Sequence, residues 1–427
     1  MGLLGSGVSI TPRVRHGLNL SAGLGWGCFR WSRGRCFGGS PWNLKHAEGW
    51  GAGGETLAWN LMRSSGDDFE RRWRGVRRAM AEQAIEALLL THLPDVRWLC
   101  GFTGSNAALA VTARKAVLFT DGRYTTQARE ETRGARVTIA KKSALREACV
   151  LLERSAKRAW FDSEHTTVAE LELMHSGLRG KNRRGFFVAL QRPLVPALRM
   201  VKDEGELALM GKAAELGCSL FEKILSRMES GVTEIAVAAE LEYLARKMGA
   251  EGMSFETIIA SGARSALPHG RATQAKLPRK GFVTLDFGVI LNGYCSDMTR
   301  TVHVGGADRE ERAAYEAVLE AQEAAVAAVK PGASCGEVDE AARSVLRKAG
   351  RGKYFTHSTG HGVGLEIHEQ PRVAAGQEMR LAAGMVITIE PGVYLPGKFG
   401  IRIEDMVAVT ESGHRVLTPV TKGWIEL

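Results

Sequence analysis

Four carboxylates interrupt apolar, strand-like runs in the C-terminal half of the chain, and this pattern limits how the chain can fold. Asp286 and Asp297 lie in FVTLDFGVILNGYCSDMTRT, Glu390 in MVITIEPGVY and Glu404 in GIRIEDMVAV. An ionised side chain is costly to bury in such a run unless it is paired. Each acid alone could be a surface charge on an edge strand or loop. Together with His361 in STGHGVGLEIHE, they predict one pocket whose charge two divalent metal ions would neutralise.

The spacing of the first two carboxylates predicts that they meet on one face of a hairpin. Asn292-Gly293 is a strong two-residue hairpin signal. A turn at this dipeptide places Asp286 opposite Thr299, and Asp297 lies two residues from Thr299. Because side chains alternate with period two, both aspartates should project from the same face, roughly 7 Å apart at Cα.

A second hairpin is predicted around Pro396-Gly397. A hairpin centred on Gly397 places Glu390 opposite Glu404. Two hairpins would then each deliver two carboxylates to the predicted metal pair.

An internal repeat with an offset of 101 residues indicates a duplicated second domain. GVT at 231–233 matches GAS at 332–334, and RKMG matches RKAG 101 positions later. In each copy a helix precedes this cap, a second helix follows, and a glycine ends it. A chance match of short helical segments is the alternative. We predict two related α-α-β-hairpin halves, 203–304 and 308–409, with the metals between them.

Composition excludes several classes of protein. The net charge is +10, but residues 1–80 hold 12 Lys/Arg against 5 Asp/Glu, so the remaining chain carries only +3. This distribution does not favour nucleic-acid binding. No segment approaches the roughly 20 apolar residues of a membrane span. Seven scattered cysteines without CxxC spacing indicate a reducing compartment, so we expect a cytoplasmic protein.

Residues 1–66 are predicted to be a disordered or non-native leader. Residues 1–61 contain 14 of the 50 glycines and five of the nine tryptophans, without helical or strand period. Glycine-rich stretches have a high ordering entropy. An aromatic, basic recognition arm and a true start at Met62 are the alternatives. We expect a chain starting at Met62 to keep its stability and activity.

Two domains are predicted after this leader, 67–198 and 199–427. The first should be an α/β domain, and the second should open with a helix capped by Asp203 with Glu206 three residues on. The expected elements of the first domain include a basic amphipathic helix and three strands: 71–83, 85–91, 107–112 and 116–120.

At residues 70–424 the sequence resembles the pita-bread metallopeptidases, specifically their Xaa-Pro aminopeptidase (aminopeptidase P) and prolidase branch. The motifs that carry the resemblance are SGARSALPHG, LDFGVILNGYCSDMTRT, HSTGHGVGLEIHE, ITIEPGVY and GIRIEDMVAVT. TGSNAALAVT and LFTDGRYTTQA resemble the creatinase-type N-terminal domain of that branch. The resemblance implies an α+β fold, with a smaller α/β domain before a pita-bread catalytic domain.

The resemblance also implies a role for each metal ligand. Asp286 is expected to bind one metal ion, and Asp297 and Glu404 to bridge both. His361 and Glu390 are expected to serve the other ion. Oxygen-rich ligation with one imidazole favours manganese, with cobalt or zinc as substitutes.

Three further histidines match family positions near the substrate: His269, His357 and His368. Arg402 is expected on the same strand face as Glu404, where it could pair with a substrate carboxylate or balance the carboxylate cluster. The remaining histidines are interpreted as surface or core residues: His16, His46, His92, His165, His175, His303 and His414.

The ligand set predicts hydrolysis. Two cations about 3.5–4 Å apart can share a water molecule and lower its pKa. His368 would help to stabilise the oxyanion, and Glu390 would shuttle the proton. His269, His368 and Glu390 are thus the candidate catalytic residues.

We expect an Xaa-Pro aminopeptidase that acts on peptides with proline at the second position. A prolidase restricted to Xaa-Pro dipeptides is the alternative, and a metal-free creatinase-like or binding homologue is a third. We expect a homodimer, although the sequence does not specify the oligomeric state.

Overall fold

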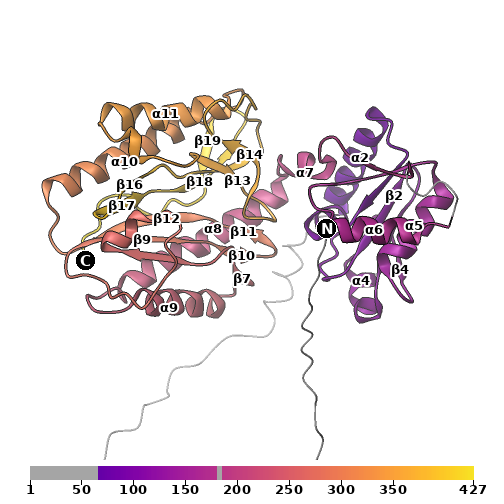
Figure 1. Cartoon of the computed structure of the whole chain (residues 1–427), viewed down its shortest axis with the longest axis horizontal. Coiled ribbons are helices and arrows are strands. Elements are labelled where there is room, and N and C mark those ends of the chain that lie inside the picture. Colours follow the sequence, from indigo (N-terminus) through magenta and orange to yellow (C-terminus); the bar gives the residue numbers. More distant parts are fainter. Residues whose placement is uncertain (1–65, 180–184) are drawn as a thin grey trace, which may run out of the picture. The chain divides into compact units, whose positions relative to one another are not determined.

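A computed structural model describes residues 66–179 and 185–427 of the chain, shown in Figure 1. The prediction of a leader at 1–66, with its five tryptophans, lies almost entirely outside the described residues. Among the residues that are described, no helix has the length and apolar character needed to cross a membrane.

Helices and strands alternate in the first part of the described chain, as expected for an α/β domain. The elements are α2 (Gly66–Glu82), β1 (Ala87–Leu90), α3 (Leu93–Cys100), β2 (Ala108–Thr112), β3 (Ala116–Thr120), α4 (Thr125–Glu131), β4 (Arg136–Ile139), α5 (Ala144–Ser155), β5 (Ala159–Phe161), α6 (Val168–Gly177), β6 (Phe187–Ala189) and α7 (Leu194–Arg199).

These strands form one mixed sheet in the order β4-β3-β2-β1-β5-β6. β1 pairs antiparallel with β2 and parallel with β5. Leu88 and Leu90 of β1 pack with α2 and α3, whereas Ala87 and Leu89 pack with α5. Because both faces of β1 are covered, its sequence is apolar throughout and shows no alternation.

The predicted boundaries of several elements in this region differ from the structure by one to five residues. The helix expected at 71–83 begins at Gly66, and Asp67 and Asp68 in its first turn complement the helix dipole. The strand expected at 85–91 is limited to 87–90, because the Ile85 amide donates to the Met80 carbonyl and closes the helix end.

The second part of the chain contains two series of helices followed by strands. The first series comprises α8 (Glu204–Leu225), α9 (Glu234–Lys247), β7 (Gly252–Met253), β8 (Ile258–Ser261), β9 (Gly281–Phe287), β10 (Val289–Leu291), β11 (Tyr294–Cys295) and β12 (Met298–Val304). The second comprises α10 (Arg309–Ala328), α11 (Cys335–Lys348), β13 (Gly360–Gly362), β14 (Glu369–Val373), β15 (Val386–Ile389), β16 (Gly392–Leu395), β17 (Phe399–Arg402), β18 (Asp405–Val409) and β19 (His414–Val416).

The order of elements and their local geometry confirm the repeat. Thr233 caps α9 and Ser334 caps α11, each through its side-chain oxygen. The glycines two residues before these caps, Gly231 and Gly332, have φ of 93° and 83°, which only glycine adopts readily. The predicted N-cap Asp203 is also confirmed and forms a capping box with Glu206.

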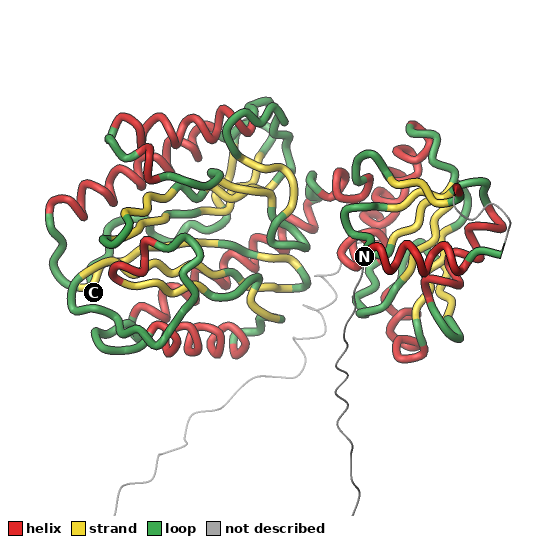
Figure 2. The backbone as a smooth tube through the Cα atoms, in the orientation of Figure 1, coloured by secondary structure: helices red, strands yellow, loops and turns green. Residues whose placement is uncertain are grey.

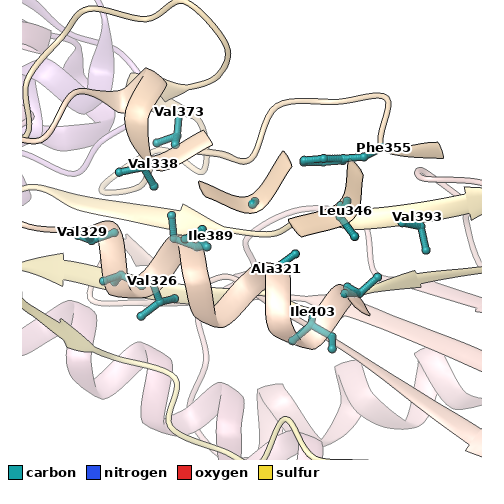
Figure 3. Close-up of a cluster of buried hydrophobic side chains, with 14 of the residues drawn as sticks. Ala321, Val326, Val329, Val338, Leu346, Phe355, Val373, Ile389, Val393 and Ile403 are labelled. Carbon is teal, nitrogen blue, oxygen red and sulfur yellow. The ribbon is translucent and has the colours of Figure 1, made fainter. Parts of the chain in front are cut away.

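Helices lie on the outside of this part of the chain and strands lie between them (Figure 2). In the second half, α10 and α11 pack on the strands through the apolar cluster of Figure 3. Ile389 and Ile403 belong to this cluster and are fully buried. Because strand side chains alternate, the next residues, Glu390 and Glu404, turn away from the helices toward the opposite face.

Candidate dinuclear metal site

A cavity of about 790 Å³ lies on that opposite face. Every candidate site residue named from the sequence lines it: His269, Asp286, Asp297, His357, His361, His368, Glu390, Arg402 and Glu404. The structure thus brings together residues spread over about 135 positions of the chain.

The first hairpin has the predicted strand register, but its two strands do not form one uninterrupted ladder. Leu291 pairs with Tyr294, and Asp286 pairs with Thr299. Between these ladders the hairpin divides into two sheets. A Cβ atom at Gly288 would lie 1.8 Å from the Ser296 carbonyl oxygen, so glycine permits the close approach at this break. Asp297 follows directly and lies outside regular strand structure.

The second hairpin places its two carboxylates at an equivalent break. Gly392 pairs with Arg402 in one sheet, and Ile389 pairs with Asp405 in another. Both ladders follow the same strand register. In that register Glu390 and Glu404 lie opposite each other, at the point where the hairpin passes from one sheet to the other. The predicted centre at Gly397 is therefore confirmed.

His361 presents a nitrogen to the carboxylates. Its Nε2 lies 3.6 Å from Asp297 Oδ2 and 3.5 Å from Glu390 Oε1. Its Nδ1 lies 3.0 Å from the Gly362 carbonyl oxygen, which requires the proton on Nδ1 and leaves Nε2 free. Burial lowers the pKa of His361 to about 4, so the ring is neutral, as metal ligation requires.

Asp297, Glu390 and Glu404 are buried close together, which favours their protonated forms when no metal ion is bound. Burial and the neighbouring Glu404 and Asp286 raise the pKa of Asp297 well above its usual value. Burial, then Glu390, does the same for Glu404, and burial raises the pKa of Glu390 to about 8. Atoms of Asp297, His361 and Glu404 also lie within 4.8 Å of one another. This donor set fits divalent metal ions.

The Arg402 side chain forms hydrogen bonds within the carboxylate cluster. Its guanidinium donates to Asp286 Oδ2 at 2.5 Å and to Thr299 Oγ1 at 3.1 Å. The Thr299 hydroxyl in turn donates to Glu404 Oε2 at 2.6 Å. Arg402 is 4% exposed. This geometry favours charge balance over the alternative role of holding a substrate carboxylate.

Arg402 also orients one of the predicted histidines. It donates to the Tyr394 hydroxyl at 2.7 Å, and that hydroxyl lies 2.9 Å from His357 Nε2. His357 Nδ1 lies 2.8 Å from the Ser358 carbonyl oxygen, so Nε2 accepts the tyrosine proton. Burial, then the charge of Arg402, lowers the pKa of His357 to about 4.

His368 lies beside the candidate ligand His361, with 4.5 Å between their ring centroids. It is carried by the connection between β13 and β14. Arg199 holds this connection by donating to Glu366 at 2.9 Å and to Glu369 at 2.5 Å. Burial, then His269, lowers the pKa of His368.

Sequence reasoning missed two groups at this cavity. Arg372 also lines it, and the position of this arginine in a strand after the histidine motif was the available signal. His165 and Glu366 also line it and lie near His92. From the sequence alone, His92 and His165 were expected to be surface or core residues. Each follows a strand end, which was the only local signal.

Comparisons with known proteins agree with this geometry. Residues 208–411 match the model of metallopeptidase family M24, and residues 72–201 match the creatinase/prolidase N-terminal domain. The chain is 37% identical to the uncharacterized peptidase YqhT of Bacillus subtilis over 359 residues, which are 82% of this chain and 99% of that protein.

Two solved structures extend the similarity. The Xaa-Pro dipeptidase from Bacillus anthracis is 37% identical with a TM-score of 0.81, covering 84% of this chain and 100% of that one. The X-Pro aminopeptidase from Thermotoga maritima is 35% identical with a TM-score of 0.75, covering 82% and 100%. The pita-bread fold and its N-terminal domain are thereby confirmed, and the chain belongs to metallopeptidase family M24.

Proposed function

We propose that this protein is a dinuclear metallopeptidase that hydrolyses Xaa-Pro dipeptides. The sequence favoured an Xaa-Pro aminopeptidase, with the dipeptidase as the alternative. The similarity to an Xaa-Pro dipeptidase over the whole of that chain and one feature of the cavity support the alternative.

That feature is an arginine whose backbone position relative to His361 is set by strand pairing. Arg372 of β14 is the cross-strand partner of His361 in β13. Cross-strand partners project from the same face of a sheet, so both side chains face the cavity, which both line. Arg271 lines the cavity too, but it is paired with Glu256 at 2.8 Å. Arg372 is therefore the better partner for a substrate carboxylate.

Such a partner selects for short peptides. In an Xaa-Pro dipeptide the terminal carboxylate lies one residue from the scissile bond. Each additional residue would move it by up to about 3.3–3.6 Å, away from the position at which Arg372 would pair with the carboxylate of a dipeptide. An Xaa-Pro bond also lacks an N–H, so the site must bind the substrate through other groups.

The candidate ligands for two metal ions are Asp286, Asp297, His361, Glu390 and Glu404. When bound, such ions activate water and polarise the scissile carbonyl. Glu390 can hold and release a proton beside them, and His368 and His269 can donate to the substrate. The choice of manganese and the homodimer stay predictions.

The test is a comparison of substrates. We expect Ala-Pro to be hydrolysed, with Ala-Pro-Ala, Ala-Pro-amide and Ala-Ala much slower, and chelation to abolish activity. Arg372→Met should lower kcat/KM for Ala-Pro by about 10–100-fold, the value of one charge-assisted hydrogen bond, mainly through KM. Exposed Arg415, on β19, provides the matched control.

The outcome separates the two exopeptidase functions. Equal rates for Ala-Pro and Ala-Pro-Ala, with Arg372→Met affecting neither, would establish the aminopeptidase instead. Equal cleavage of Ala-Ala and Ala-Pro would refute proline specificity altogether.

A further inference from the structure

Two histidines of the N-terminal sheet meet a glutamate of the catalytic half. β1 and β5 are parallel neighbours, and His92 and His165 follow their carboxyl ends by two and four residues. Carboxyl ends of parallel neighbours lie at the same sheet edge, where ligand sites are common. Glu366, from the connection between β13 and β14, completes the group, and its ligand atoms lie within 4.8 Å.

The distances in this group suit a metal ion. His92 Nε2 lies 3.2 Å from Glu366 Oε1. Two ligands at about 2.0–2.1 Å in a tetrahedral zinc site are separated by about 3.3 Å. The rings of His92 and His165 stack with centroids 3.7 Å apart at 21°, so the two imidazoles lie directly beside each other.

The other ring nitrogens face carboxylates. His92 Nδ1 lies 3.3 Å from Asp95 Oδ2, and His165 Nδ1 lies 2.9 Å from Asp162 Oδ2. Metal-binding histidines usually direct their second nitrogen at such a group, which fixes the ring and its tautomer. His92 Nδ1 and Asp95 Oδ2 are buried without a hydrogen-bond partner among the described residues, so this pair is not satisfied as it stands.

The charges in direct contact with the group do not balance. Three carboxylates meet one permanent cation there, which leaves two negative charges: Asp95, Asp162 and Glu366 against Arg199. Protons on both stacked rings would place two like charges face to face. One divalent ion would supply the same charge without that repulsion.

We propose that His92, His165 and Glu366 bind a third metal ion, zinc, separate from the dinuclear site. Two imidazoles and a carboxylate suit zinc. His165 and Glu366 line the wall of the cavity, so the fourth coordination position faces the substrate space. The ion would tie the ends of β1 and β5 to the connection that carries His368.

Zinc stoichiometry tests this assignment without any activity measurement. The untagged full chain, dialysed against micromolar zinc and then zinc-free buffer, should hold three zinc ions by elemental analysis. His92→Gln, His165→Gln and Glu366→Gln should each lose one ion relative to the wild type. Asp162→Asn should lower the affinity for that ion by about 10–100-fold, because a carboxylate behind a metal-binding histidine supports metal binding.

Two controls separate this site from the dinuclear one. His175→Gln, on α6 of the same sheet domain, should keep all ions. Asp297→Ala should lose metal from the dinuclear site and keep the third ion. The assignment is overturned if the variants of the three ligands that fold, judged by circular dichroism, bind as much zinc as the wild type.

Discussion

Removal of the metal ions should make the stability of this protein fall as pH rises from about 4.5 to 8. Burial, reinforced by Asp286, raises the pKa of Glu390 from 4.5 to about 8 in the metal-free cluster. Folded Glu390 thus keeps its proton where the unfolded chain has lost it. The contribution of Glu390 to the free energy of unfolding is therefore fully present below pH 4.5. It declines as the pH rises and is lost above about pH 8.

The expected magnitude follows from that interval. The range from 4.5 to about 8 spans about 3.5 pH units, and at about 1.4 kcal/mol per unit it corresponds to a loss on the order of 5 kcal/mol. For a domain of this size the melting temperature should drop by about 10–20 °C. Bound metal requires deprotonated ligands, so the melting temperatures of the loaded and metal-free forms should diverge as pH rises.

Calorimetry or urea unfolding of the chelated protein at several pH values measures this effect. Glu390→Gln has no proton to lose at this position, so its metal-free stability should depend less on pH. Glu411→Gln, at an exposed loop position, should behave as the wild type. If metal-free wild type and Glu390→Gln show the same pH dependence, the raised pKa is not the cause and the reasoning fails.

Three further outcomes are expected. Gly360→Ala should lower the free energy of unfolding, measured in urea, by about 3 kcal/mol. The added Cβ would lie 1.9 Å from the Thr388 carbonyl oxygen and would separate β13 from β15. A loss below about 1 kcal/mol would contradict this packing. Arg199→Met should lower the free energy of unfolding by about 3–5 kcal/mol, because it removes the buried guanidinium that pairs with Asp95 and Glu369. An unchanged unfolding midpoint would refute that. Asp297→Ala should abolish hydrolysis and reduce bound metal while circular dichroism stays unchanged; retained activity would exclude Asp297 as a ligand.

Local sequence was sufficient for the hairpins that carry the carboxylates. Asn292 and Gly293 have φ of 49° and 80°, as a type I′ turn requires at both central positions. Once that turn is specified, the pairing of Asp286 with Thr299 follows by counting along both strands. The caps of α8, α9 and α11 could be predicted for the same reason, because each depends on residues within one turn of helix.

The break in the first hairpin could not be predicted in this way. The hydrophobic pattern continues through Val289 and Met298, so the run has the appearance of one ladder. Gly288 permits its backbone to approach Ser296, but a glycine in a strand is equally consistent with an ordinary pair. Packing against the rest of the domain decides between them.

The partners of buried charges were decided only by the tertiary structure. The sequence left two roles open for Arg402, and its ion pair with Asp286 joins residues 116 positions apart. His92 meets Glu366 across 274 positions, and it meets His165 because β1 and β5 pair in parallel. Turns, caps and strand alternation depend on neighbouring residues, and they can be deduced from the chain itself. Side chains this far apart become neighbours only when sheets and helices pack, and no local pattern specifies that packing.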